Sequence, residues 1–427
     1  MMSVAQSAAR AWPSDPSAAS DIDPSTRFVA RQPIFDRQQE VFGYELLFRS
    51  SWSNVYDHTD GDAASAQILN QTLNIHGLAN LTGGGRAFIN FTRSMMINVD
   101  YGMLPPESTV IELLEDVERD DGLVAACRKL KDAGYMLALD DVVYDARYDQ
   151  LIDLADIVKI DFMQTTAAQR RDMIGQFKRL GVCLLAEKVE THEAFREATE
   201  SGYAYVQGFF FAHPQIVSGR DVPVSDHNHL LFLSEISRPK LDFDRLERIV
   251  KQDVSLSTKL LRYLNSAALG VPNQITSIRQ ALALLGERPL RRWASLVLLS
   301  RLAKGKPSEL IVATLIRARF CELISAHTGD GDGQFEAFLV GMLSTIDVML
   351  GRPAEQLLEE MPIPDGVKSA LLDDQTHLGT ILGLAIACER ADTQRLTELW
   401  HALSLTESLV AEAHRAAIVW AQQVYRD

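Results

Sequence analysis

The stretch Gly43-Tyr44-Glu45-Leu46-Leu47-Phe48-Arg49 places one carboxylate in an apolar run with the composition of a β-strand. A carboxylate in such a run must face water, pair with a cation or bind a metal, because burying an uncompensated charge is costly. Taken alone, Glu45 has a simpler interpretation, since an exposed strand face also carries glutamate. The segments that follow decide whether it has partners.

Strand-like runs and helical patterns alternate around this stretch, from residue 27 to about residue 214. The runs at 28–35 and 41–48 are predicted to pair as a hairpin. Further strands are predicted at 87–91, 110–114, 135–139, 157–160, 182–186 and 205–211, and helices at 63–78, 120–133, 167–180 and 192–201. Alternation at this spacing predicts parallel βαβ units, in either a closed barrel or a doubly wound sheet.

The composition is that of a globular protein and excludes some functions. The 427 residues carry a formal net charge of −15, which disfavours binding to duplex nucleic acid because that needs a basic face. The four cysteines are far apart, as expected of reduced thiols in a cytoplasmic protein. No apolar run has the length needed to span a membrane, so no membrane association is expected.

Polar side chains recur at the ends of the predicted strands. In a barrel of parallel strands the chemistry lies at these carboxyl ends. With Glu45, the set comprises Asn90, Glu112, Asp140, Asp141, Lys159, Asp161, Glu187, Glu190 and Gln207. Several carboxylates at one barrel mouth would repel each other without a cation, and oxygen ligands without His or Cys favour Mg²⁺ or Mn²⁺.

Such a site could hydrolyse a phosphodiester. Two metal ions can activate a water and stabilise the leaving oxygen. Lys159 could orient that water or offset phosphate charge, and Glu187 could take its proton. Each residue alone also has a structural explanation: a solvated strand end, a helix cap, a turn at Asp140-Asp141, or a surface lysine whose ammonium reaches solvent. The coincidence across successive strands favours the site.

The strand-end motifs resemble those of EAL domains. The first stretch looks like the signature of that family, with Leu46 where the name-giving alanine usually stands. The resemblance covers about residues 27–214, and its motifs occur in the family's order. They are Gln32-Pro33-Ile34, Asn90, residues 112–115, Asp140-Asp141, Lys159-Ile160-Asp161, Ala186-Glu187-Lys188-Val189-Glu190 and Gln207-Gly208-Phe209.

The resemblance implies a modified TIM barrel that hydrolyses cyclic di-GMP to the linear dinucleotide with Mg²⁺ or Mn²⁺, and often pairs as a homodimer. It implies that the metal ligands are Glu45, Asn90, Glu112, Asp140 and Asp141. Lys159, Glu187 and Glu190 would be catalytic. Gln32, Arg49, Asp161 and Gln207 would bind the substrate.

Three departures from the family pattern bear on activity. The Asp pair is followed by Val142-Val143-Tyr144-Asp145-Ala146-Arg147 instead of Phe-Gly-Thr-Gly-Tyr-Ser, a loop that couples metal binding to dimerisation in the family. Lys188 replaces the usual glycine; its cation could enter the site, but we expect it to point to solvent. Leu114 replaces the usual threonine.

The pattern from residue 230 onward is helical throughout. Residues 257–267 and 278–286 resemble an HDOD domain, a helical relative of HD phosphohydrolases. The metal-binding His-Asp pair of those enzymes is expected at 341–346, where Ser344 and Thr345 stand, and hydroxyls are poor ligands for divalent metals. His327 is expected to be a capping or surface residue. The predicted division is a disordered tail at 1–26, an EAL-like barrel at 27–214, a linker at 215–228 and an HDOD-like domain at 229–427.

Two hypotheses follow from this combination. In the first, the barrel is a metal-dependent cyclic di-GMP phosphodiesterase, and the HDOD domain regulates it or contacts a protein partner. In the second, the barrel is catalytically impaired and acts as a cyclic di-GMP receptor or as a protein-interaction module. The retained acidic set favours the first hypothesis, and the altered residues 142–147 favour the second.

Overall fold

The computed structural model describes residues 28–49, 78–98, 104–114, 120–140, 149–212, 235–238, 240–252, 257–258, 260, 277–302, 305–329, 333–361 and 363–426. The chain forms two compact units. One covers Arg27–His213 and contains all the described strands, and the other covers Pro214–Cys388 and Asp392–Asp427 and is helical. No helix in these described ranges is long and apolar enough to cross a membrane.

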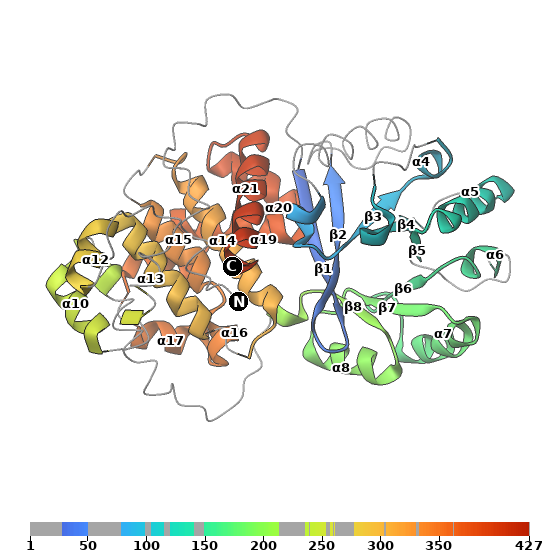
Figure 1. Cartoon of the computed structure of the whole chain (residues 1–427), viewed down its shortest axis with the longest axis horizontal. Coiled ribbons are helices and arrows are strands. Elements are labelled where there is room, and N and C mark those ends of the chain that lie inside the picture. The colour runs from blue at the N-terminus through green and yellow to red at the C-terminus, as the bar shows by residue number, and fades with distance from the viewer. Residues whose placement is uncertain are drawn as a thin grey trace. The chain divides into compact units, whose positions relative to one another are not determined.

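The first unit is a closed eight-stranded barrel with the strands in sequence order (Figure 1). Strand β1 runs antiparallel to both β2 and β8, and every other neighbouring pair is parallel. The predicted hairpin is confirmed, and the barrel replaces the alternative of a doubly wound sheet. The strands are β1 (Phe28–Asp36), β2 (Val41–Arg49), β3 (Arg86–Phe91), β4 (Thr109–Leu113), β5 (Met136–Leu139), β6 (Ile157–Asp161), β7 (Cys183–Glu187) and β8 (Tyr205–Gln207).

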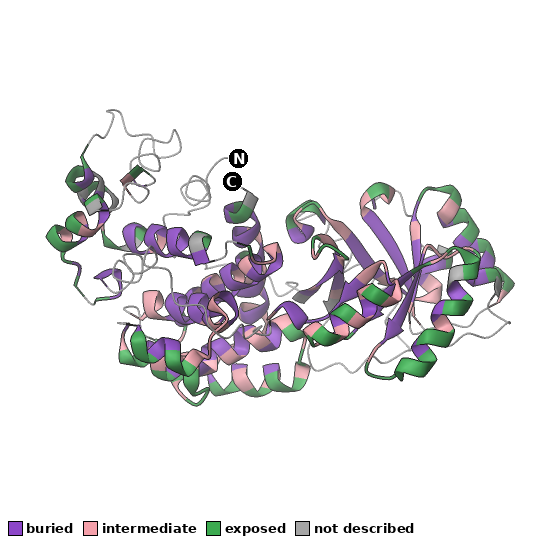
Figure 2. Cartoon of the chain, turned by 90° about the horizontal axis from the view of Figure 1, so that it is seen from below, coloured by how far each residue is buried: buried purple, intermediate pink, exposed green. Residues whose placement is uncertain are grey.

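A layer of apolar side chains fills the barrel beneath the polar strand ends. It consists of Ile34, Phe88, Val110, Ala138, Ile157 and Leu185, each 0% exposed. Side chains two residues apart on a strand face the same side. Asn90, Glu112, Asp140, Lys159 and Glu187 each lie two residues after one member of this layer, so they face inward as the next layer toward the strand ends. Figure 2 shows the largely buried strands of the barrel.

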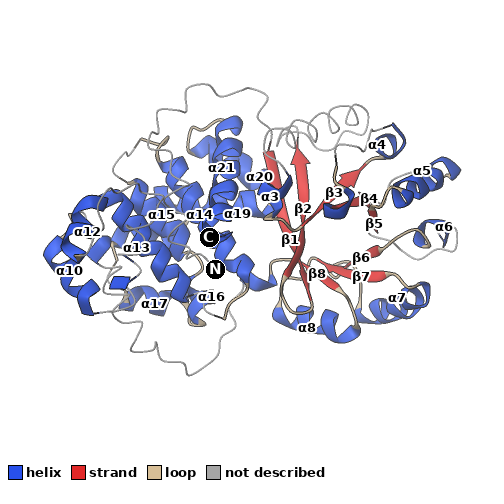
Figure 3. Ribbon diagram, in the orientation of Figure 1, coloured by secondary structure: helices blue, strands red, loops and turns tan. Residues whose placement is uncertain are grey.

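Helices follow the strands of the barrel unit (Figure 3). Helix α5 begins where the Asp120 side chain accepts a hydrogen bond from the backbone N–H of Leu123 at 2.9 Å, and α8 is capped in the same way by Thr191. Gly202 ends α8 in a left-handed conformation. The helices are α3 (Leu78–Thr82), α4 (Arg93–Asn98), α5 (Asp121–Asp132), α6 (Asp149–Ile152), α7 (Ala167–Leu180) and α8 (His192–Ser201).

One expectation for the barrel is wrong in its bounds, and another falls on residues that the structure does not describe. The strand expected at 205–211 ends at Gln207, and Phe210–Ala212 form a 3-10 turn instead. The break follows Gly208, whose φ of +149° and close approach to the Val189 backbone leave no room for a side chain. The helix expected at 63–78 lies outside the described residues, apart from Leu78.

The second unit is built from helices around an apolar core that includes Trp293, Phe320 and Phe338. Helix α15 packs closely on α14 at Gly341, where a Cβ atom would lie 2.5 Å from the Arg317 backbone. The described helices are α10 (Phe243–Gln252), α12 (Ile278–Leu285), α13 (Glu287–Leu302), α14 (Ser308–Ser325), α15 (Gln334–Leu343), α16 (Ile346–Leu350), α17 (Ala354–Glu360), α18 (Asp365–Leu372), α19 (His377–Arg390), α20 (Thr393–Ala402) and α21 (Glu407–Arg426). The all-α second half is thereby confirmed.

Candidate active site at the barrel mouth

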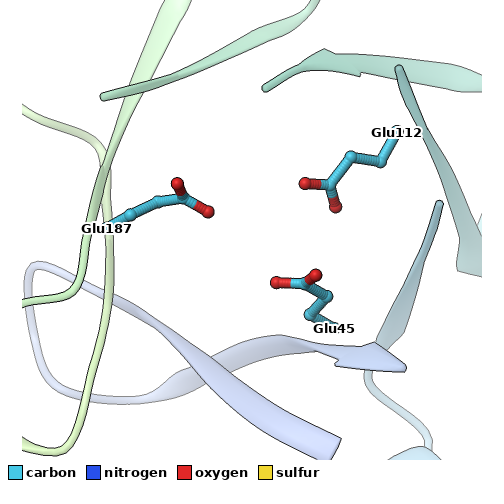
Figure 4. Close-up of side chains that lie close together, drawn as sticks. All are labelled: Glu45, Glu112 and Glu187. Atoms are coloured by element: carbon cyan, nitrogen blue, oxygen red, sulfur yellow. The ribbon is translucent and has the colours of Figure 1, made fainter. Parts of the chain in front are cut away.

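Three glutamates from separate strands point toward one another inside the barrel (Figure 4). Glu45 comes from β2, Glu112 from β4 and Glu187 from β7. Carboxylate oxygens of the three lie within 4.8 Å of one another, and all three residues are buried. The predicted convergence of the strand-end carboxylates on one place is therefore a feature of the structure.

Lys159 on β6 lies among these carboxylates. Its ammonium contacts Glu112 at close range, Glu187 at 2.5 Å, Glu45 at 3.5 Å and Asp140 at 3.6 Å. The Lys159 side chain is 1% exposed. The interpretation of Lys159 as a surface lysine reaching solvent is wrong, because the strand period turns this side chain into the barrel. Its charge compensates part of the negative charge of the cluster.

Three amide side chains orient the acidic cluster. Asn90 donates a hydrogen bond to Glu45 Oε1 at 3.0 Å, and Gln207 donates to Glu45 Oε2 at 2.6 Å. Gln207 also donates to Gln32 Oε1 at 2.9 Å. Gln32 lies on β1 opposite Glu45 in the strand register, because the antiparallel direction of β1 brings the early part of this strand to the same end of the barrel. Glu45 is thus held from both sides.

Several oxygens in this layer have no hydrogen-bond donor among the described residues. They are Asn90 Oδ1, Glu112 Oε2 and Gln207 Oε1, and each atom is buried; Asp140 Oδ1 is also buried without a hydrogen bond and has the Lys159 ammonium at 3.6 Å. Buried polar atoms are normally paired, so a set without donors indicates a missing partner. Carboxylate and amide oxygens without nitrogen or sulfur fit a hard divalent cation. The residues present therefore suit a divalent metal ion.

The charges of the cluster perturb one another. Burial raises the pKa of Glu112 well above its usual value, and the nearby carboxylates add to that effect against the charge of Lys159. Burial likewise raises the pKa of Glu187 to about 8. For Glu45, the ammonium of Lys159 and the amide hydrogen bonds outweigh burial and lower the pKa. Burial would lower the pKa of Lys159, but the surrounding carboxylates hold it well above its usual value.

Asp161 and Lys188 form a separate pair beside the cluster. Asp161 lies opposite Glu187 in the register of β6 and β7, and its carboxylate accepts a close contact from the ammonium of Lys188. The other carboxylate oxygen accepts hydrogen bonds from the backbone N–H groups of Met163 at 2.6 Å and Gln164 at 3.0 Å. Burial opposes these contacts, but together they lower the pKa of Asp161.

Lys188 is exposed, as expected, but its ammonium is also paired within the barrel unit. Its side chain is 52% exposed, but its ammonium is held by the buried Asp161. The backbone of Lys188 has a φ of +54°, in the left-handed region that favours glycine. This conformation explains why glycine suits the position. The replacement of that glycine was the signal in the sequence, whereas the pairing with Asp161 could be seen only in the structure.

We expect Lys188→Gly to be more stable than Lys188→Ala by about 1 kcal/mol. Both variants lose the ammonium, and only alanine keeps a Cβ in the left-handed backbone. Chemical denaturation of the two variants measures the difference. Lys131 provides the control, because it pairs with Asp156 at 2.6 Å from within helix α5. At position 131 the order should reverse, so that Lys131→Gly is less stable than Lys131→Ala by about 0.5–1 kcal/mol. The same order at both positions would contradict the backbone explanation.

The structure does not test the roles predicted for several other site residues. Asp141 and residues 142–147 are not among the described residues, nor is the side chain of Arg49. Glu190 follows β7 and is half-buried. The assigned roles of these residues stay predictions.

The hydroxyls that stand in place of the His-Asp pair of HD enzymes are engaged in the helical unit. Thr345 Oγ1 lies 2.7 Å from Thr314 Oγ1, and Ser344 donates to the Gly341 carbonyl at 2.8 Å and accepts from Arg317 at 3.2 Å. These contacts join α14 to the end of α15. His327 is exposed. The segment therefore packs two helices together.

The fold and the acidic site define an EAL domain followed by an HDOD domain. The family model of the EAL domain matches residues 55–214, and that of the HDOD domain matches residues 226–361. The chain belongs to the same family as two relatives that match it along most of its length. The uncharacterized protein YuxH of Bacillus subtilis is 37% identical over 402 residues, which are 92% of this chain and 97% of YuxH. The cyclic di-GMP phosphodiesterase CdgJ of Vibrio cholerae is 36% identical over 414 residues, which are 94% of each chain.

A solved structure is also similar to part of this chain. A standalone EAL protein from Vibrio cholerae O395, in its c-di-GMP-bound form, is 22% identical with a TM-score of 0.36, covering 46% of this chain and 93% of its own.

Proposed function

We propose that the barrel hydrolyses cyclic di-GMP to the linear dinucleotide with Mg²⁺ or Mn²⁺. The observation that carries this proposal is the inward layer of carboxylates and amides with buried oxygens that lack donors among the described residues. The relation to CdgJ, which is named as a cyclic di-GMP phosphodiesterase, supports this substrate. A structural scaffold would leave this costly buried layer unexplained.

Glu45, Asn90, Glu112 and Asp140 are proposed to hold the cation, with Asp141 as a further ligand predicted from the sequence. Amide hydrogen bonds already orient Glu45, so this ligand is positioned in advance. A bound divalent cation supplies activation of the attacking water and stabilisation of the leaving oxygen. The same cation would also be a partner for the buried oxygens that lack a hydrogen-bond donor among the described residues.

Lys159 and Glu187 are proposed to act on the water. Glu187 accepts a proton from the water as its oxygen bonds to phosphorus, and the bond from phosphorus to one bridging ribose oxygen breaks. The ring then opens to one terminal phosphate and one ribose oxygen, which takes a proton from solvent water to become a hydroxyl. Lys159, 2.5 Å from Glu187, orients the water and offsets phosphate charge. Glu190 is proposed to assist at the end of β7, and Gln32, Arg49, Asp161 and Gln207 to bind the substrate.

The helical unit is proposed to regulate the barrel or to contact a protein partner. Its Ser344-Thr345 segment holds helices together through hydroxyl hydrogen bonds, which supports an interaction role over catalysis. Homodimerisation of the protein and a cytoplasmic location also stay proposals.

We expect purified protein to convert cyclic di-GMP to the linear dinucleotide with Mg²⁺ or Mn²⁺ and to lose turnover in excess EDTA. Chromatography follows the product, and a second addition of metal should restore the rate. Tight binding of cyclic di-GMP without turnover would overturn hydrolysis and favour the receptor, the alternative suggested by the altered residues 142–147. If the protein neither binds cyclic di-GMP nor hydrolyses it, the hydrolysis proposal and the receptor alternative are both overturned.

A further inference from the structure

We propose that Lys188 is a substrate-binding residue, whose ammonium contacts a phosphate of the cyclic dinucleotide at the rim of the barrel. This inference rests on the proposed function. Lys188 directly follows Glu187, the last residue of β7, and so lies at the same end of the barrel as the acidic cluster. Three observations support this contact with a phosphate: the position of the Lys188 ammonium, the strained backbone at this residue, and the charge of its surroundings.

The placement of the ammonium is determined by Asp161. That carboxylate is 3% exposed and is itself fixed by the backbone N–H groups of Met163 and Gln164. Asp161 therefore anchors the Lys188 head group from the protein side. The Lys188 side chain as a whole is 52% exposed, so it lies at the surface of the barrel mouth. An ammonium anchored in this way on a half-exposed side chain is suited to contact an anionic ligand, because part of its conformational entropy is already lost.

The backbone at this position is strained. A lysine with a φ of +54° adopts a conformation that glycine would adopt without a Cβ penalty. Residues held in sparsely populated backbone regions cluster at functional sites, where other interactions maintain them. At Lys188 the strained backbone directs the side chain to Asp161, on the neighbouring strand. The strain thus accompanies a defined position of the cation.

The negative charge of the barrel mouth bears on the role of the Lys188 ammonium. Glu45, Glu112, Asp140 and Glu187 surround Lys159, whose ammonium is 1% exposed and engaged with them. A doubly anionic dinucleotide is repelled by such a cluster unless cations face it. Lys188 places a positive charge beside the last carboxylate of the set, in a pair with Asp161 that is neutral as a whole. Its chemistry fits a phosphodiester better than a neutral ligand.

The test compares equilibrium binding of cyclic di-GMP among full-length variants. Binding is measured by calorimetry with Ca²⁺, after chromatography has verified that no turnover occurs. We expect Lys188→Met to bind about tenfold more weakly than the wild type, the typical effect of losing one charged hydrogen bond. Lys188→Arg should retain affinity within about threefold, since the charge remains. The affinity of the wild type should also fall more steeply with added KCl than that of Lys188→Met.

Two variants separate contact from indirect effects. Lys131→Met removes an equal charge from a Lys–Asp pair that precedes β6 at the other end of the barrel, and it should bind like the wild type. Asp161→Asn should weaken binding less than Lys188→Met, because the ammonium remains. The proposal is overturned if Lys188→Met binds like Lys131→Met. It is also overturned if Lys188→Arg binds as weakly as Lys188→Met. A wild type that fails to bind cyclic di-GMP would overturn the proposed function as well.

Discussion

Replacing Lys159 with methionine is expected to lower the free energy of unfolding by about 3–5 kcal/mol in EDTA at pH 8, and to abolish hydrolysis. The lysine is 1% exposed and contacts four carboxylates, so its removal leaves buried charges without compensation. A hydrophobic side chain of similar length fills the space but cannot supply charge. The expected loss is therefore electrostatic.

The destabilisation should depend on pH and on metal. The pKa of Glu112 is raised in the folded protein, and loss of Lys159 raises it further. A raised carboxyl pKa contributes stability that is present below the unfolded value and is lost as pH rises through the folded value. The variant should thus differ less from the wild type at pH 5 than at pH 8. Mg²⁺ or Mn²⁺ should recover part of the loss by restoring positive charge.

Denaturation with urea at pH 5 and pH 8, with EDTA or with metal, measures this effect. Lys131→Met is the matched control, because Lys131 pairs with the partly exposed Asp156. This control should lose about 1 kcal/mol or less. An equal loss for Lys159→Met at both pH values would show that packing rather than charge is responsible.

Glu45→Ala is expected to reduce hydrolysis at saturating cyclic di-GMP by at least about a hundredfold, since it removes a proposed metal ligand together with its orienting hydrogen bonds. Glu45 accepts hydrogen bonds from Asn90 and Gln207, and both amides lose their acceptor in the variant. The affinity for Mn²⁺ should fall in parallel, while the barrel remains folded because the apolar layer beneath is unchanged.

Product formation, Mn²⁺ binding by calorimetry and circular dichroism together test this expectation. Glu193→Ala is the control, since Glu193 pairs only loosely with Arg196 on the exposed surface of α8. It should keep the activity of the wild type. Unchanged turnover in Glu45→Ala would remove this carboxylate from the metal site. Lost turnover with unchanged Mn²⁺ affinity would assign Glu45 another role.

The amino-acid sequence predicts much of the site because strand geometry is local. A period of two along each strand places Asn90, Glu112 and Glu187 on the same face as the apolar residues that precede them. The order of the motifs then indicates the family. The behaviour of Lys159 was harder to predict, because a lone lysine in a strand also fits a solvated face. Only its position among four carboxylates distinguishes the two.

The sequence by itself determined which side chains each strand contributes and which of them turn inward, since both depend on the order of residues along one strand. The tertiary structure decided which side chains meet. Closure of the barrel brings Gln207 on β8 within 2.6 Å of Glu45 on β2, across 162 residues of chain. It also buries Lys159 and joins Lys188 to Asp161. These contacts depend on strand number, direction and register, which follow from packing of the whole barrel and not from any local pattern.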